Sequence, residues 1–80
     1  MNKIVFFGQP GCMPCHKLHM DMRKKGIEYI YKDVRQDIRA QQEMLHYSNG
    51  NFLTPTIVIN EGETVLQNPD LRSVEEAAAS

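Results

Sequence analysis

The feature that most constrains this chain is a pair of cysteines, Cys12 and Cys15, within residues 8–16. An apolar run, residues 4–7, precedes them and has the β-branched and aromatic composition of a buried strand. The residues that follow favour a helix. A cysteine at a helix start lies beside unpaired N–H groups and the positive end of the helix dipole. That environment favours the thiolate, so we expect the pKa of one thiol to fall below its ordinary value of about 8.5.

The length and charge of the chain exclude several classes of protein. Its 80 residues predict a single domain, residues 1–80, and nine basic against ten acidic side chains give no excess of basic charge for binding nucleic acid. The apolar run at residues 4–7 is too short for a secretory signal or a membrane span. We therefore expect a cytoplasmic monomer with neither nucleic acid nor membrane as a partner. In a reducing cytoplasm, closely spaced cysteines are typical of catalytic or metal sites.

Hydrophobic patterning and turn residues predict seven elements in the order βαβαββα. The predicted strands are residues 3–7, 27–34, 56–59 and 63–66, and the predicted helices are residues 12–25, 36–47 and 71–79. A strand–helix–strand unit implies parallel pairing, and we place residues 3–7 centrally in the sheet.

Each predicted helix has apolar positions at helical spacing. The first helix would bury a stripe of three residues: Cys15, Leu18 and Met22. In the second, the pattern gives a row with Ile38 and Leu45 and an adjoining row with Ala40, Met44 and Tyr47. Asp70 is the predicted cap of the last helix, which would dock Leu71, Val74 and Ala77 or Ala78.

The two thiols have different expected roles in thiol–disulfide exchange. Cys12, first and more exposed, is the predicted nucleophile, and Cys15, one helical turn further in, is the resolving thiol. Because Pro14 has no N–H, the backbone donors to a Cys12 thiolate reduce to those of Cys15 and Met13. Stabilisation of the thiolate is then moderate, which predicts a reductant more than a strong oxidant.

Four motifs together resemble those of the glutaredoxins and the small, glutaredoxin-like NrdH-redoxins of the thioredoxin-like superfamily. They are Phe-Gly-x-x-Gly-Cys-x-x-Cys at residues 7–15, Asp33-Val34, Thr54-Pro55 and Asp70-Leu71. The resemblance spans nearly the whole chain. It implies an α/β fold with a four-stranded mixed sheet flanked by three helices. It also implies a cis Pro55 packed against the Cys12–Cys15 turn, which leaves the Thr54 backbone groups free to pair with an extended substrate segment.

The resemblance implies disulfide-containing protein substrates or glutathione mixed disulfides, with two possible electron donors. Glutathione is one, and a thioredoxin-reductase-like flavoenzyme is the other, with ribonucleotide reductase as a possible partner. Glutaredoxins usually carry a basic residue where this chain has Gln9, and a Gly-Gly pair where it reads Val-Leu-Gln-Asn at residues 65–68. Both departures weaken glutathione binding and favour the flavoenzyme. The predicted substrate-contacting residues are Met13, Pro14, Thr54, Pro55 and Asp70.

Several residues have alternative interpretations. Cys12-Met13-Pro14-Cys15-His16 also spells the attachment motif of c-type haem. Cys12, Cys15, His16 and His19 offer a zinc-like ligand set, and a dimer could share an iron–sulfur cluster through Cys12. The alternative class is therefore a non-enzymatic thioredoxin-like module that binds a metal or cluster. Lys17 is either a partner of the Cys12 thiolate or a solvated side chain.

Overall fold

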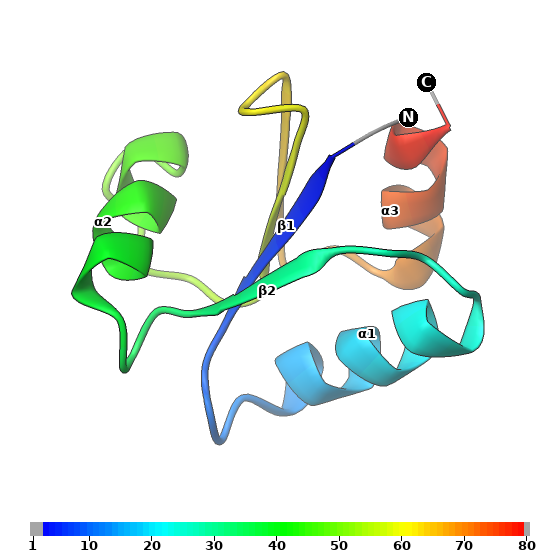
Figure 1. Cartoon of the computed structure of the whole chain (residues 1–80), viewed down its shortest axis with the longest axis horizontal. Coiled ribbons are helices and arrows are strands. Elements are labelled where there is room, and N and C mark those ends of the chain that lie inside the picture. Colours follow the sequence, from blue (N-terminus) through cyan, green and yellow to red (C-terminus); the bar gives the residue numbers. More distant parts are fainter. Residues whose placement is uncertain (1–2, 80) are drawn as a thin grey trace.

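A computed structural model describes residues 3–79 of the chain. Within these residues, four strands form one mixed sheet in the order β2-β1-β3-β4, and three helices flank it (Figure 1). The elements are β1 (Ile4–Gly8), α1 (Met13–Lys24), β2 (Ile30–Asp33), α2 (Ile38–Tyr47), β3 (Thr56–Ile59), β4 (Thr64–Gln67) and α3 (Leu71–Ala78). The predicted order βαβαββα and the predicted thioredoxin-like architecture are confirmed. No helix within residues 3–79 has the length and apolar character needed to cross a membrane.

The strand β1 lies inside the sheet, as its composition predicted. It pairs in parallel with β2 and antiparallel with β3, and β3 continues into an antiparallel hairpin with β4. Every residue of β1 and β3 is buried. Strands covered on both faces need no polar alternation, which is why both segments read as continuous apolar runs.

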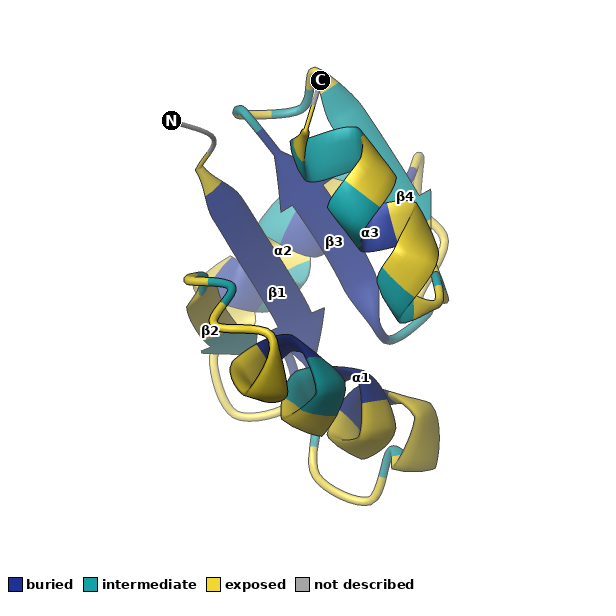
Figure 2. Ribbon diagram, turned by 90° about the vertical axis from the view of Figure 1, so that its right-hand side faces the viewer, coloured by how far each residue is buried: buried dark blue, intermediate teal, exposed yellow. Residues whose placement is uncertain are grey.

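The helices divide the core into two layers. On one face of the sheet, Phe6 and Ile57 pack with Met22 of α1 and Val74 of α3. On the other face, residues such as Phe7 and Val58 pack with α2. Figure 2 shows this arrangement, with α1 and α3 in front of the strands and α2 behind them. The cysteine-bearing helix is thereby fixed against the face of β1 that carries Phe6.

The second strand begins at residue 30, three residues later than predicted, after the turn that ends α1. Gly26 adopts φ +71°, and its N–H donates to the Arg23 carbonyl while the Ile27 N–H donates to the Met22 carbonyl. This is a Schellman ending, in which Ile27 packs back on the helix and cannot join the sheet. The strand therefore begins at Ile30, opposite Val5.

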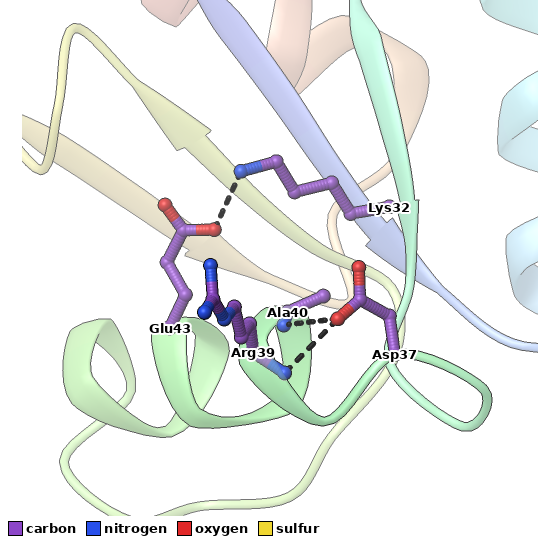
Figure 3. A network of polar contacts seen from close by, with 5 residues as sticks. All are labelled: Lys32, Asp37, Arg39, Ala40 and Glu43. Carbon is purple, nitrogen blue, oxygen red and sulfur yellow. Dashed lines mark hydrogen bonds and ion pairs between the residues drawn. The ribbon is translucent and has the colours of Figure 1, made fainter.

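The expected face of α2 is only half correct. Ala40 and Met44 are buried, whereas Ile38 is 63% exposed. At about 100° per residue, Ile38 lies about 200° around the helix from Ala40, so it points away from the sheet. Leu45, from the same predicted row as Ile38, is partly buried and packs at the edge of the core. Asp37 caps this helix, because its carboxylate accepts hydrogen bonds from the N–H groups of Arg39 and Ala40 (Figure 3). An ion pair at 2.7 Å between Lys32 of β2 and Glu43 of α2 joins the helix to the sheet.

Candidate active site

The two cysteines lie where the loop after β1 leads into α1, as predicted. Cys12 is the N-cap residue, with an extended backbone (φ −91°, ψ 103°), and Cys15 lies in the first turn of α1. They are joined by a disulfide with Cα atoms 5.2 Å apart. Cys12 is half-buried, whereas Cys15 is only 3% exposed and belongs to the core beside Leu18. The sequence therefore ranked the exposure of the two sulfurs correctly.

Two hydrogen-bond donors point at the Sγ atom of Cys12. The backbone N–H of Cys15 donates at 3.1 Å, as expected for a cap residue whose side chain accepts from the first turn. The hydroxyl of Thr54 donates at 3.4 Å, and the Thr54 carbonyl lies 3.7 Å from the same sulfur. Sequence reasoning gave Thr54 a backbone role only and missed its hydroxyl, although a threonine next to a predicted cis proline at the cysteine turn was a sufficient signal.

The loop before β3 presses against the cysteine turn through Thr54 and Pro55. The Thr54–Pro55 peptide bond is cis and Pro55 is buried, so the expected cis proline is confirmed. Gln9, in the loop after β1, reaches across and donates its amide N–H to Thr54 Oγ1 at 3.0 Å. In the sequence, Gln9 stood out only because it replaces a basic residue, and this contact was not predicted.

An open pocket of about 450 Å³ lies beside the disulfide. Both cysteines line it, together with Gln9, His19 and Tyr31. His19 is held in place by a hydrogen bond between its Nδ1 and the hydroxyl of Tyr29 on the neighbouring segment. Partial burial, with a smaller effect of the Asp33 carboxylate, raises the pKa of Tyr31, so its hydroxyl is neutral at physiological pH. A substrate that reaches the disulfide from this side meets aromatic and imidazole rings.

A second open pocket, of about 240 Å³, lies between α1 and the start of α3. Pro14 and Leu18 line it from α1, and Asp70 and Leu71 line it from α3. The first pocket uses helix positions 12, 15, 16 and 19, and this one uses 14, 17, 18 and 21, which lie on opposite sides of α1. Substrate groups can therefore approach the cysteine turn from either side of the helix.

Asp70 caps α3, as predicted. Its carboxylate accepts from the N–H of Ser73 at 2.9 Å, and this hydrogen bond is the main cause that lowers the pKa of Asp70 below 3.8. Met13, by contrast, touches little of the protein and is 74% exposed at the start of α1. Of the predicted substrate-contacting residues, Thr54 and Pro55 thus lie at the disulfide, Pro14 and Asp70 share the second pocket, and Met13 projects into solvent.

Two alternative interpretations fail against the geometry. Lys17 is paired with Asp21 at 2.8 Å, a contact that raises the pKa of Lys17, and it is not a partner of Cys12. Within residues 3–79, no three His, Cys, Asp or Glu side chains are grouped to hold a metal ion. The predicted zinc-like ligand set is therefore not assembled in this structure. Its two cysteines form a disulfide, and His19 is hydrogen-bonded to Tyr29.

Comparisons with known proteins agree with the fold and the site. A family model described as Glutaredoxin matches residues 4–65. The Gene 56 protein of Mycobacterium phage D29 is 30% identical over 66 residues, covering 79% of this chain and 69% of the phage protein. The crystal structure of the thioredoxin-like protein BC3987 superposes with a TM-score of 0.79 at 27% identity, covering 92% of this chain and 97% of that one. A mutant of BC3987 also gives a TM-score of 0.79, at 28% identity and with 98% and 100% coverage. With a disulfide-bonded Cys-x-x-Cys pair at the start of α1, the chain belongs to the glutaredoxin family and is a glutaredoxin-like dithiol–disulfide oxidoreductase.

Proposed function

We propose that Cys12 is the nucleophile and Cys15 the resolving thiol of this oxidoreductase. The observation that carries the proposal is the contrast between the two sulfurs. Cys12 is half-buried and its Sγ accepts hydrogen bonds from the Cys15 N–H and the Thr54 hydroxyl, whereas Cys15 is only 3% exposed. Hydrogen bonds and a helix N-terminus stabilise a thiolate, and only an accessible thiolate attacks a substrate.

The reaction starts from the reduced dithiol. The Cys12 thiolate attacks one sulfur of a substrate disulfide, RS–SR′, which forms a Cys12–S–S–R bond and releases R′S⁻. Cys15, after losing its proton, attacks Cys12 Sγ, forms the intramolecular disulfide and releases RS⁻. Two electrons pass to the substrate, and the two protons of the dithiol end on the released thiols.

The substrate would bind around Thr54 in an extended conformation. Thr54 precedes β3, and its carbonyl lies beside Cys12 Sγ, so a substrate strand that pairs with the Thr54 backbone would place its disulfide at that sulfur. Met13 offers an exposed apolar side chain next to the same turn. Pro14 and Asp70 line the groove between α1 and α3, where flanking parts of the substrate would lie.

We further propose that a thioredoxin-reductase-like flavoenzyme returns two electrons to the disulfide, as for an NrdH-redoxin. Gln9 supports this choice, because its uncharged amide is bound to Thr54 and offers no cation to a glutathione carboxylate. Disulfide-bonded proteins, with ribonucleotide reductase as one candidate, would be the substrates. A reducing compartment such as the cytoplasm suits this role, since the attacking form is the dithiol.

Two coupled assays run side by side test the electron donor. One contains NADPH, thioredoxin reductase and the protein, and the other contains NADPH, glutathione reductase and glutathione, with the same disulfide substrate. We expect NADPH consumption to be faster in the first. Gln9→Lys is the matched variant, because it adds a cation while keeping a donor, and it should raise the rate with glutathione. Turnover with glutathione alone would overturn the flavoenzyme proposal and leave the dithiol chemistry intact.

A further inference from the structure

Three side chains from three separate segments form a chain of hydrogen bonds that ends on the sulfur of Cys12. Gln9 follows β1, Thr54 precedes β3, and Cys12 caps α1. The Gln9 amide donates to Thr54 Oγ1 at 3.0 Å, and the same oxygen donates to Cys12 Sγ at 3.4 Å. Gln9 is therefore linked to the sulfur of Cys12 by way of the Thr54 hydroxyl.

The direction of the Thr54 hydroxyl depends on its neighbour. A hydroxyl has one hydrogen to donate and two lone pairs to accept with. When the Gln9 N–H occupies one lone pair, the hydroxyl hydrogen is free to point at Cys12 Sγ. Without that donor, the hydroxyl can rotate toward water, and the sulfur loses one of its two donors.

We propose that Gln9 is a positioning residue, which orients the Thr54 hydroxyl so that its hydrogen is directed at Cys12 Sγ. The inference rests on the proposed nucleophilic role of Cys12. Hydrogen bonds to a charged acceptor are stronger than those to a neutral one, so the contact would strengthen when the disulfide is reduced and Cys12 ionises. Gln9 then tunes the thiolate without touching it.

Other titratable groups surround the cysteine turn and must be kept constant. His16 and His19 of α1 and Tyr31 of β2 line the pocket beside Cys12, and Asp70 of α3 lines the groove on the other side of the helix. None of these residues is changed in the variants below, so their influence on the thiol cancels when variants are compared with the reference.

The experiment measures the pKa of Cys12 from the rate of alkylation by iodoacetamide across a pH series. A Cys15→Ala background leaves one thiol to titrate and avoids coupling between two sulfurs. The variants are Gln9→Met, Thr54→Val, the double variant and Thr54→Ser, which keeps a hydroxyl. Gln42→Met, at an exposed position of α2, is the matched control. Thermal unfolding of each variant verifies that it is folded.

We expect Thr54→Val to raise the pKa of Cys12 by about one unit, the size expected for loss of a hydrogen bond to a charged group. Gln9→Met should raise it by about half a unit, because the hydroxyl then points at the sulfur only part of the time. The decisive result is the double variant, which should match Thr54→Val, since Gln9 acts only through the hydroxyl. Thr54→Ser should lie close to the reference, and Gln42→Met should not differ from it.

Two outcomes overturn the positioning role. One is a Gln9→Met variant with the pKa of the reference, and the other is a double variant in which the two shifts add in full. If the reference thiol itself titrates like free cysteine, the proposed nucleophilic role of Cys12 fails and the positioning role fails with it. If the pKa of Cys12 in the reference is lowered but either of the first two outcomes is found, only the positioning role of Gln9 fails and the nucleophilic role of Cys12 stands.

Discussion

Gly8 lies so close to Tyr31 that a β-carbon at position 8 would come 2.7 Å from the Tyr31 hydroxyl oxygen and 3.1 Å from its ring. Phe6 Cε1 would also lie within 3.1 Å. Gly8 ends β1 opposite Asp33 of β2, and Tyr31 stands two residues before that partner. The missing side chain therefore gives the Tyr31 ring its place as one wall of the pocket beside the disulfide.

Gly8→Ala should destabilise the protein by about 1 kcal/mol, because the added methyl group overpacks a site bounded by Phe6 and Tyr31. Tyr31 is 43% exposed and can move, whereas Phe6 is fully buried. Urea unfolding of Gly8→Ala with and without Tyr31→Ala checks this explanation. The cost should shrink in the Tyr31→Ala background, and an equal cost in both backgrounds would place the strain elsewhere.

Cys12→Ser should reduce disulfide reduction to the uncatalysed background, because the attacking sulfur is gone. Cys15→Ser should instead accumulate a mixed disulfide between Cys12 and a protein substrate, visible as a band that reductant removes on non-reducing electrophoresis. Retained turnover of Cys15→Ser on glutathione mixed disulfides would favour a monothiol mechanism. Capture through Cys15 in the Cys12→Ser variant would contradict the assigned roles.

Asp70 should contribute to stability in a pH-dependent way. Its pKa is lowered in the folded state, chiefly by the hydrogen bond from the Ser73 N–H, so the unfolded chain binds a proton more readily. The contribution is therefore fully present above pH 3.8 and is lost as the pH falls through the lower, folded-state pKa. Asp70→Asn keeps an oxygen acceptor but cannot ionise.

Urea midpoints of the natural protein and Asp70→Asn, measured from pH 6 to pH 2.5, check the role of this carboxylate. Other carboxylates titrate in both proteins, so the difference between the two midpoints isolates Asp70. The advantage of aspartate should disappear at the acid end of the series. A difference that stays constant with pH would show that the charge of Asp70 does not stabilise α3.

The exposed and buried apolar residues of α2 should respond differently to truncation. Met44→Ala should cost about 2 to 5 kcal/mol, because Met44 is fully buried against the sheet and its removal leaves a cavity. Ile38→Ala should change stability by less than about 0.5 kcal/mol. Chemical denaturation of the two variants measures both values. A large cost at Ile38 would mean that this face of α2 is covered.

Local patterns predicted most of the fold because each had a local physical cause. The continuous apolar runs of β1 and β3 required burial on both faces, and the residues Cys12, Asp37 and Asp70 begin helices because their side chains accept from the first turn. Asp37 itself was not predicted as a cap, because the helix was expected to begin at residue 36, two residues before Ile38. The same apolar run predicted the position of β1 inside the sheet, between β2 and β3.

The features that the sequence did not predict depend on particular contacts that the hydrophobic pattern does not mark. The start of β2 depends on how α1 ends, where the Ile27 N–H donates a hydrogen bond to the Met22 carbonyl. The approach of Gln9 to Thr54 joins residues 45 positions apart, and no periodicity marks it. The space over Gly8 likewise depended on which way the Tyr31 ring turned. Motifs located the chemistry of the site, whereas its supporting contacts required the tertiary structure.

The burial of Cys15 has a consequence for survival under oxidative stress. A peroxide arriving from solvent meets the sulfur of Cys12 first, since its neighbour is 3% exposed. Oxidation of Cys12 would give a sulfenic acid, and Cys15 lies within bonding reach to condense with it, releasing water and forming the disulfide. We expect oxidation to end at the disulfide, which a reductant can reverse, because the disulfide bond removes the sulfenic acid before it is oxidised to a sulfinic acid.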